Sequence, residues 1–156
     1  MTTTTAPQLV ITRVVDAPRA LVYKAFTDPD QFAAWWGPMG NLLDQVEVDV
    51  RSGGHMEWHE VFPAEPGIWT NGRIDLTDVV DGELLDGVMR ITGHLPRGFE
   101  PFETRMRVEF YDETGGRTRL EVRQWLPASY VSPTENGWGE QFSKLDAVLA
   151  AEGRSS

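Results

Sequence analysis

The chain contains no cysteine, which excludes disulfide bonds, thiolate metal sites and a cysteine nucleophile. No apolar run approaches the length of a membrane-spanning helix, and the opening MTTTTAPQ lacks the charged-then-apolar pattern of a secretory signal. Basic residues are scarce: 14 Lys and Arg stand against 24 Asp and Glu, giving a formal net charge of −10. Nucleic acids and anionic membranes bind basic surfaces, so neither is expected as a partner. These absences favour a cytoplasmic protein.

The sequence also lacks the common catalytic motifs. It has no nucleophile elbow, no phosphate-binding glycine loop and no dinucleotide fingerprint, so no catalytic residue and no cofactor are assigned. His55 and His59 are four residues apart, the spacing of a metal pair on a helix. Their segment alternates with period two, however, which places them about two pleats apart on the outer face of a strand. We therefore expect no metal site.

The patterns that are present predict one α+β domain of 156 residues with an ordered core over about residues 8–152. Apolar residues recur at helical spacing in the long C-terminal segment, where Trp138, Phe142, Leu145 and Leu149 form one stripe. The expected strands cover residues 8–16, 46–51, 55–62, 68–79, 84–91, 102–110 and 118–125, and the expected helices cover 19–26, 31–36 and 136–152. A sheet followed by such a helix buries one face against the apolar stripe.

Four motifs in this order resemble those of the helix-grip superfamily, which includes START domains and the birch-pollen allergen. They are ITRVVDAPRALVYKAFTDPDQFAAWWGP, VEVDVRSGGHMEW, TRLEVRQ and NGWGEQFSKLDAVLA. Within this superfamily the chain resembles the bacterial family related to the activator of the ninety-kilodalton heat-shock chaperone ATPase. The resemblance implies a curved antiparallel sheet of six or seven strands around a long C-terminal helix. It also implies two short helices after the first strand, which close one end of an apolar pocket.

The resemblance leaves three functions open. The first is non-enzymatic binding of a small hydrophobic or aromatic molecule between the sheet and the C-terminal helix. The second is a protein-interaction domain of the stress response, which would act through its surface like the chaperone activators. The third is an enzyme similar to polyketide cyclases. An open cavity of several hundred cubic ångströms would favour the first function, whereas an interior filled by side chains would favour the second. A homodimer through a sheet edge or the short helices is plausible.

Two adjacent tryptophans, Trp35 and Trp36, precede the helix-breaking pair Gly37-Pro38. Neighbouring side chains cannot point the same way on a helix or a strand, so the two rings need two different surfaces. We expect one ring to pack inward under the short helices and the other to lie near the entrance of the pocket. The alternative is that both rings wedge the short helices against the sheet, since tryptophan is usually a packing residue.

Alternation along the strands predicts which side chains face the pocket. Met56, Trp58 and Glu60 share an inward face, and Gln124 shares its own with Leu120. Glu60, Gln124 and Thr104 are then the few polar groups around an apolar gap, as in many ligand sites. Glu60 could instead reach solvent at the end of its strand, and Gln124 could be a hydrogen-bonded core residue. The predicted pocket residues are Trp35, Trp36, Trp58, Glu60, Thr104, Met106, Leu120, Gln124, Trp138 and Phe142.

Overall fold

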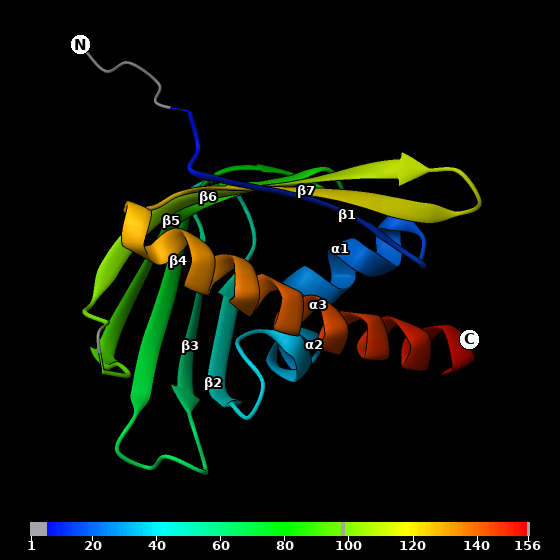
Figure 1. Cartoon of the computed structure of the whole chain (residues 1–156). Helices are drawn as coiled ribbons and strands as arrows, with labels where there is room; N and C mark the ends of the chain where they lie inside the picture. The colour runs from blue at the N-terminus through cyan, green and yellow to red at the C-terminus, as the bar shows by residue number, and fades with distance from the viewer. Residues whose placement is uncertain (1–5, 98, 156) are drawn as a thin grey trace.

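One antiparallel sheet curves around a long helix in the computed structural model, which describes residues 6–97 and 99–155 (Figure 1). Its strands are β1 (Leu9–Val15), β2 (Leu42–Asp49), β3 (His55–Val61), β4 (Trp69–Val80), β5 (Leu84–His94), β6 (Phe102–Glu113) and β7 (Arg117–Trp125). They lie in the order β1-β7-β6-β5-β4-β3-β2, so every neighbour except the β1–β7 pair is joined by a hairpin connection. The predicted α+β helix-grip fold is confirmed, with seven strands.

The two short helices are α1 (Arg19–Thr27) and α2 (Pro29–Trp35). Asp28 separates them and caps α2, because its Oδ2 accepts a hydrogen bond of 3.0 Å from the backbone N–H of Gln31. Pro29 occupies the first position of α2, where a missing N–H costs nothing. Both helices lie beside the C-terminal half of the long helix and contact the sheet there (Figure 1).

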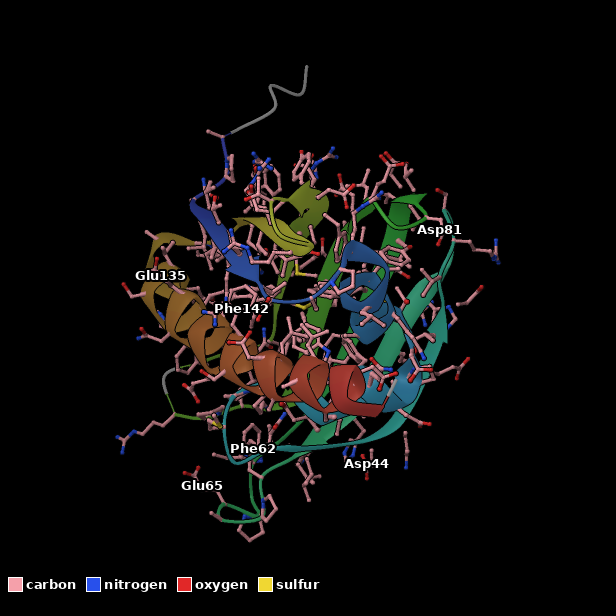
Figure 2. The ribbon with its side chains drawn as sticks, turned by 90° about the vertical axis from the view of Figure 1, so that its right-hand side faces the viewer. Asp44, Phe62, Glu65, Asp81, Glu135 and Phe142 are labelled. Carbon is pink, nitrogen blue, oxygen red and sulfur yellow. The ribbon has the colours of Figure 1, made fainter. Side chains whose placement is uncertain are left out.

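The long helix α3 (Ala128–Ser155) crosses the concave side of the sheet. Its predicted stripe is confirmed, since Trp138, Phe142, Leu145 and Leu149 are all buried. In Figure 2, Phe142 lies on the side of α3 that faces the sheet, and Glu135 points away from the protein. The helix starts about two turns before the predicted residue 136. The sequence hides these turns because the continuous apolar stripe begins only at Trp138. None of the described helices is long and apolar enough to cross a membrane.

Aromatic side chains fill the half of the interior between the sheet, α1, α2 and the later part of α3. Phe26 makes edge contacts with Trp35 at 4.6 Å and with Phe110 at 5.1 Å between ring centroids. Trp35 is fully buried, and its indole N–H donates a hydrogen bond of 2.7 Å to the carbonyl of Ala25. The polar atom of this large ring is therefore satisfied inside the core. The other half of the interior, beside the first turns of α3, is open.

Candidate functional site

A pocket of about 390 Å³ occupies this open half of the interior. Its walls come from the first half of α3, the loop after α2, the strands β3 to β7, and the segment between β5 and β6. Most of its lining is apolar or aromatic: Trp36, Pro38, Trp58, Phe62, Met89, Ile91, Leu95, Pro96, Phe99, Phe102, Tyr130, Pro133 and Trp138. A cavity between sheet and C-terminal helix was predicted from the resemblance, and the structure contains one.

The inner wall centres on Trp36. Its ring stacks on Phe32 with 4.9 Å between centroids, and it makes edge contacts with Trp58 at 5.6 Å and with Trp138 at 5.4 Å. The two adjacent tryptophans thus serve two surfaces, as the sequence predicted: Trp35 packs in the filled core and Trp36 lines the pocket. Trp36 is only 5% exposed, so it forms a deep wall and does not stand at an open entrance.

Other aromatic residues line the pocket nearer the surface, close to the start of α3. The ring of Tyr130 makes edge contacts with Phe102 at 4.9 Å and with Phe99 at 5.6 Å. The Tyr130 hydroxyl accepts a hydrogen bond of 3.1 Å from the Glu100 N–H and donates one of 3.2 Å to its carbonyl. These contacts hold the segment between β5 and β6 against α3. Phe99 is 36% exposed, so an apolar ring reaches solvent here.

On another side of the pocket, the loop after α2 is fastened to α3 by hydrogen bonds. The N–H of Gly37 donates to Oε1 of Gln141 at 2.7 Å, and the N–H of Met39 donates to Oε1 of Glu140 at 2.8 Å. Gly37 has a φ of +89°, a backbone conformation that glycine adopts without steric cost. This loop, residues 37–41, is called the strap below. It fixes one wall of the pocket to the helix.

Glu60 is buried, so the alternative that it reaches solvent is wrong. Its Oε2 accepts a hydrogen bond of 2.5 Å from Nδ2 of Asn41 in the strap, and its Oε1 accepts one of 2.9 Å from the hydroxyl of Thr70. The other side of the Asn41 amide accepts a hydrogen bond of 2.8 Å from Nζ of Lys144 on α3. Asn41 therefore bridges a buried carboxylate on β3 and an ammonium group on α3, and Thr70 links the same carboxylate to β4.

This environment shifts the pKa of both charged groups. Burial raises the pKa of Glu60, and the hydrogen bonds from Asn41 and Thr70 together with the charge of Lys144 only partly oppose that rise. Burial also lowers the pKa of Lys144, against the attraction of Glu60 and Glu140. Each group is thus held in a site that disfavours its charged form.

We expect the free energy of unfolding to depend on pH through Glu60. A carboxyl group whose pKa is higher in the folded than in the unfolded chain binds its proton better when folded, so stability falls as it ionises. Wild type should therefore lose stability relative to Glu60→Gln as the pH rises from about the ordinary value of 4.5, and the difference should level off above the folded pKa. Urea titrations at several pH values measure this, with the exposed Glu135→Gln as control. A difference independent of pH would contradict it.

Gln124 is the second buried polar group of the lining, with 1% of its surface exposed. Its Oε1 accepts a hydrogen bond of 2.6 Å from the indole N–H of Trp138. Its Nε2 is buried and has no hydrogen-bond partner among the described residues. The two interpretations from the sequence, a hydrogen-bonded core residue and a pocket residue, therefore both apply to Gln124.

The structure brings half of the predicted residues together around the pocket: Trp36, Trp58, Glu60, Gln124 and Trp138. The others are buried but do not line the pocket: Thr104, Met106 and Leu120 on the strands, and Trp35 and Phe142 on the helices. Met106 and Phe142 belong to the packed core, and the Thr104 hydroxyl donates to the carbonyl of Trp125 at 2.7 Å. Alternation identifies the inward face of a strand, but it does not say which part of that face another element covers. Helices α1 and α2 cover this part.

Many lining residues were not predicted, among them those between β5 and β6, those on α3 around Trp138, and Phe62, Thr70, Met89 and Ile91 on or next to the strands. Gln141 lies three residues after Trp138 and four after Gly137, so its side chain neighbours both positions on the helix surface. A polar residue and a glycine beside an apolar stripe were the available signal. The two histidines lie outside the pocket, where His59 pairs with Asp44 at 2.7 Å and His55 with Glu47 at 3.5 Å.

A curved antiparallel sheet that holds a C-terminal helix, closed by two short helices on one side and hollow on the other, defines a helix-grip domain. The chain matches the model of one family of such domains, described as activator of Hsp90 ATPase homolog 1-like protein, over residues 16–150. The protein therefore belongs to this family, as the sequence motifs indicated.

Solved structures agree with this assignment at the level of the fold. A protein from Mycobacterium smegmatis is 22% identical with a TM-score of 0.76, over 92% of this chain and 91% of its own. One from Chromobacterium violaceum is 23% identical with a TM-score of 0.75, over 90% and 96%. An AHSA1-like protein from Aeromonas hydrophila is 20% identical with a TM-score of 0.72, over 93% and 94%. The comparison with curated proteins gives no match.

Proposed function

We propose that the protein binds a small hydrophobic or aromatic molecule in this pocket and does not convert it. The observation that carries the proposal is the open cavity of about 390 Å³ with its largely apolar lining. Ligand pockets in proteins usually span about 300–1,000 Å³ and combine apolar walls with a few fixed polar groups. A domain that acts only through its surface needs no such cavity, which is why pocket binding is favoured over surface interaction.

The polar groups of the lining support binding over catalysis. Both oxygens of Glu60 accept hydrogen bonds from the protein, and the Thr70 hydroxyl is used in one of them. The described lining residues include neither histidine nor cysteine, and the Tyr130 hydroxyl is bonded to the backbone of Glu100. Glu60 thus fastens the strap, and no reacting pair of side chains is formed in the described walls.

The sharpest test uses the two glycines on either side of Trp138. Gly137 lines the pocket and Gly139 is exposed, and a Cβ atom would meet no other atom within 4 Å at either position. A leucine at residue 137 therefore starts from an unhindered Cβ and takes up pocket volume, whereas a leucine at residue 139 starts on an exposed part of the helix. Both changes replace a helical glycine, which favours the helix by up to about 1 kcal/mol. Gly137→Leu and Gly139→Leu are thus a matched pair.

We expect wild type and Gly139→Leu to bind the neutral dye Nile red at one saturable site with micromolar affinity. Gly137→Leu should bind it at least about fivefold more weakly, a loss of about 1 kcal/mol. Dye fluorescence measures the affinity, and native mass spectrometry of freshly purified protein shows whether a small molecule is retained. Equal affinities in all three proteins would locate the dye elsewhere. Together with the absence of any retained molecule, that result would overturn the proposal in favour of surface interaction.

A further inference from the structure

The unpaired donor of Gln124 is the feature of the pocket that the packing of the protein does not explain. Gln124 lies on β7, where Leu9 and Met106 on the neighbouring strands flank it in register, and its side chain faces α3. A buried amide N–H group without a partner lowers stability, because it has lost its hydrogen bonds to water and gained none. Such groups are rare in folded proteins and call for a specific explanation.

The orientation of the Gln124 amide is determined by its neighbour Trp138. An indole N–H can only donate a hydrogen bond, so the atom of Gln124 that lies 2.6 Å from it must be the oxygen. Turning the amide over would place two donors against each other and remove this bond. The free group is therefore the NH₂, which can only donate. A partner for it must supply a hydrogen-bond acceptor.

The charges of the pocket restrict that partner further. Among the described lining residues two are acidic, Glu60 and Glu140, and none is lysine, arginine or histidine. The whole chain carries a formal net charge of −10, which adds to the repulsion of anions. The nearest cation on α3, Lys144, already donates to Asn41 and to the carbonyl of Pro38 at 3.2 Å. An anionic ligand would therefore enter the pocket without a charged partner.

We propose that the pocket selects neutral apolar molecules that carry a carbonyl-type oxygen, and that this oxygen accepts a hydrogen bond from Nε2 of Gln124. The inference rests on the proposed function, because it specifies the ligand class of the same pocket. The aromatic wall of Trp36, Trp58 and Trp138 packs against the apolar part of the ligand, and Gln124 sets the position of its oxygen. Fatty acids and other carboxylates are excluded from the class.

Three probes of similar shape separate these requirements. 2-Acetylnaphthalene has the carbonyl oxygen, 2-isopropenylnaphthalene has a methylene group in its place, and 2-naphthoate has the negative charge. Isothermal titration calorimetry with wild type, Gln124→Met and Gln31→Met gives the affinities. Methionine matches the length of glutamine but cannot donate, and Gln31 on α2 provides the same chemical change outside the lining. Both neutral probes meet the same altered wall in Gln124→Met, but this change also frees the indole N–H of Trp138 to donate to the ketone. Gln124→Glu is therefore measured beside it, because it removes the NH₂ group and keeps an acceptor for Trp138.

In Gln124→Met the affinity ratio of the ketone to the alkene should fall by about fivefold to tenfold, the range of one neutral hydrogen bond to a buried group. Gln31→Met should keep the wild-type ratio. Naphthoate should bind wild type at least about tenfold more weakly than the ketone. The ¹³C resonance of a labelled ketone carbonyl should lie further downfield in wild type than in Gln124→Met. If Gln124→Met does not fold, Gln124→Glu retains the acceptor for Trp138 while replacing the NH₂ group.

The possible failures are distinguishable. If both neutral probes bind but their ratio and the carbonyl resonance are the same in wild type, Gln124→Met and Gln124→Glu, the selection by Gln124 is wrong and pocket binding stands. If naphthoate binds as tightly as the ketone, the restriction to neutral ligands is wrong. If neither neutral probe binds and Gly137→Leu leaves Nile red binding unchanged, the proposed function fails and this inference fails with it.

Discussion

Leu145→Ala is expected to lower the free energy of unfolding by about 2–5 kcal/mol, the range measured for buried leucines. Leu145 lies in the middle of the α3 stripe, has no exposed surface and packs in the half of the interior that side chains fill. Truncation there leaves a cavity in a closely packed core, so the cost includes lost contacts as well as lost burial. Alanine is a good helix former, so the substitution should not lower the intrinsic stability of helix α3.

The matched control is Leu42→Ala at the start of β2, where the leucine is 59% exposed. The same atoms are removed from a side chain that is largely in water, so the change should stay within about 0.5 kcal/mol. Urea denaturation followed by tryptophan fluorescence measures both variants. If Leu145→Ala costs no more than Leu42→Ala, the assignment of this residue to the core is wrong.

Gly37→Ala should be the second large effect, at about 3 kcal/mol. An L-residue at a φ of +89° costs about 1–2 kcal/mol, and the new Cβ would lie 2.2 Å from Nδ2 of Asn41 and 2.3 Å from Oε2 of Glu60. These two atoms are hydrogen-bonded to each other. The methyl group must therefore separate them, and Glu60 remains buried without its hydrogen bond from Asn41. An unsatisfied buried polar group adds about 1–3 kcal/mol.

Gly40→Ala is the control for the cost of placing an L-residue at a positive φ. Gly40 has a φ of +87°, and a Cβ there would meet no atom within 4 Å. It should cost about 1–2 kcal/mol, so the difference between the two variants reports on the Asn41–Glu60 contact alone. Gly37→Ala should also weaken Nile red binding, since the strap forms a wall of the pocket, whereas Gly40 lies outside the lining. Equal losses of stability in the two variants would show that Asn41 and Glu60 can move apart freely.

The sequence predicted the elements and the inward faces because both depend on short-range periodicity. Trp58, Glu60 and Gln124 were placed correctly by counting every second residue along a strand. The position of the hollow could not be found in this way. It depends on where α1 and α2 dock on the curved sheet, and docking is set by contacts between residues far apart in the chain.

The hydrogen bonds of the pocket could not be predicted from the sequence either, because they also join residues that are far apart in the chain. Asn41, Thr70 and Lys144 come from three different parts of the chain, and their meeting at Glu60 follows only from the assembled fold. The unpaired donor of Gln124 is likewise visible only once the partner of its oxygen, Trp138, is known. Burial of a carboxylate and an amide among apolar residues was the part that alternation alone could predict.

The division of the interior into a filled and a hollow half has a consequence for divergence among related chains. Phe26, Trp35 and Phe110 belong to the closely packed core, whereas the shape of the hollow also depends on lining residues outside that core, here called the rim, such as Pro96, Phe99 and Thr134. Substitutions on the rim do not change that core, so the shape of the hollow, and with it the preference for the proposed ligand, can change among related chains while the fold is retained. A randomised library restricted to the rim should therefore yield mostly folded members, which makes this scaffold suitable for engineered sensors.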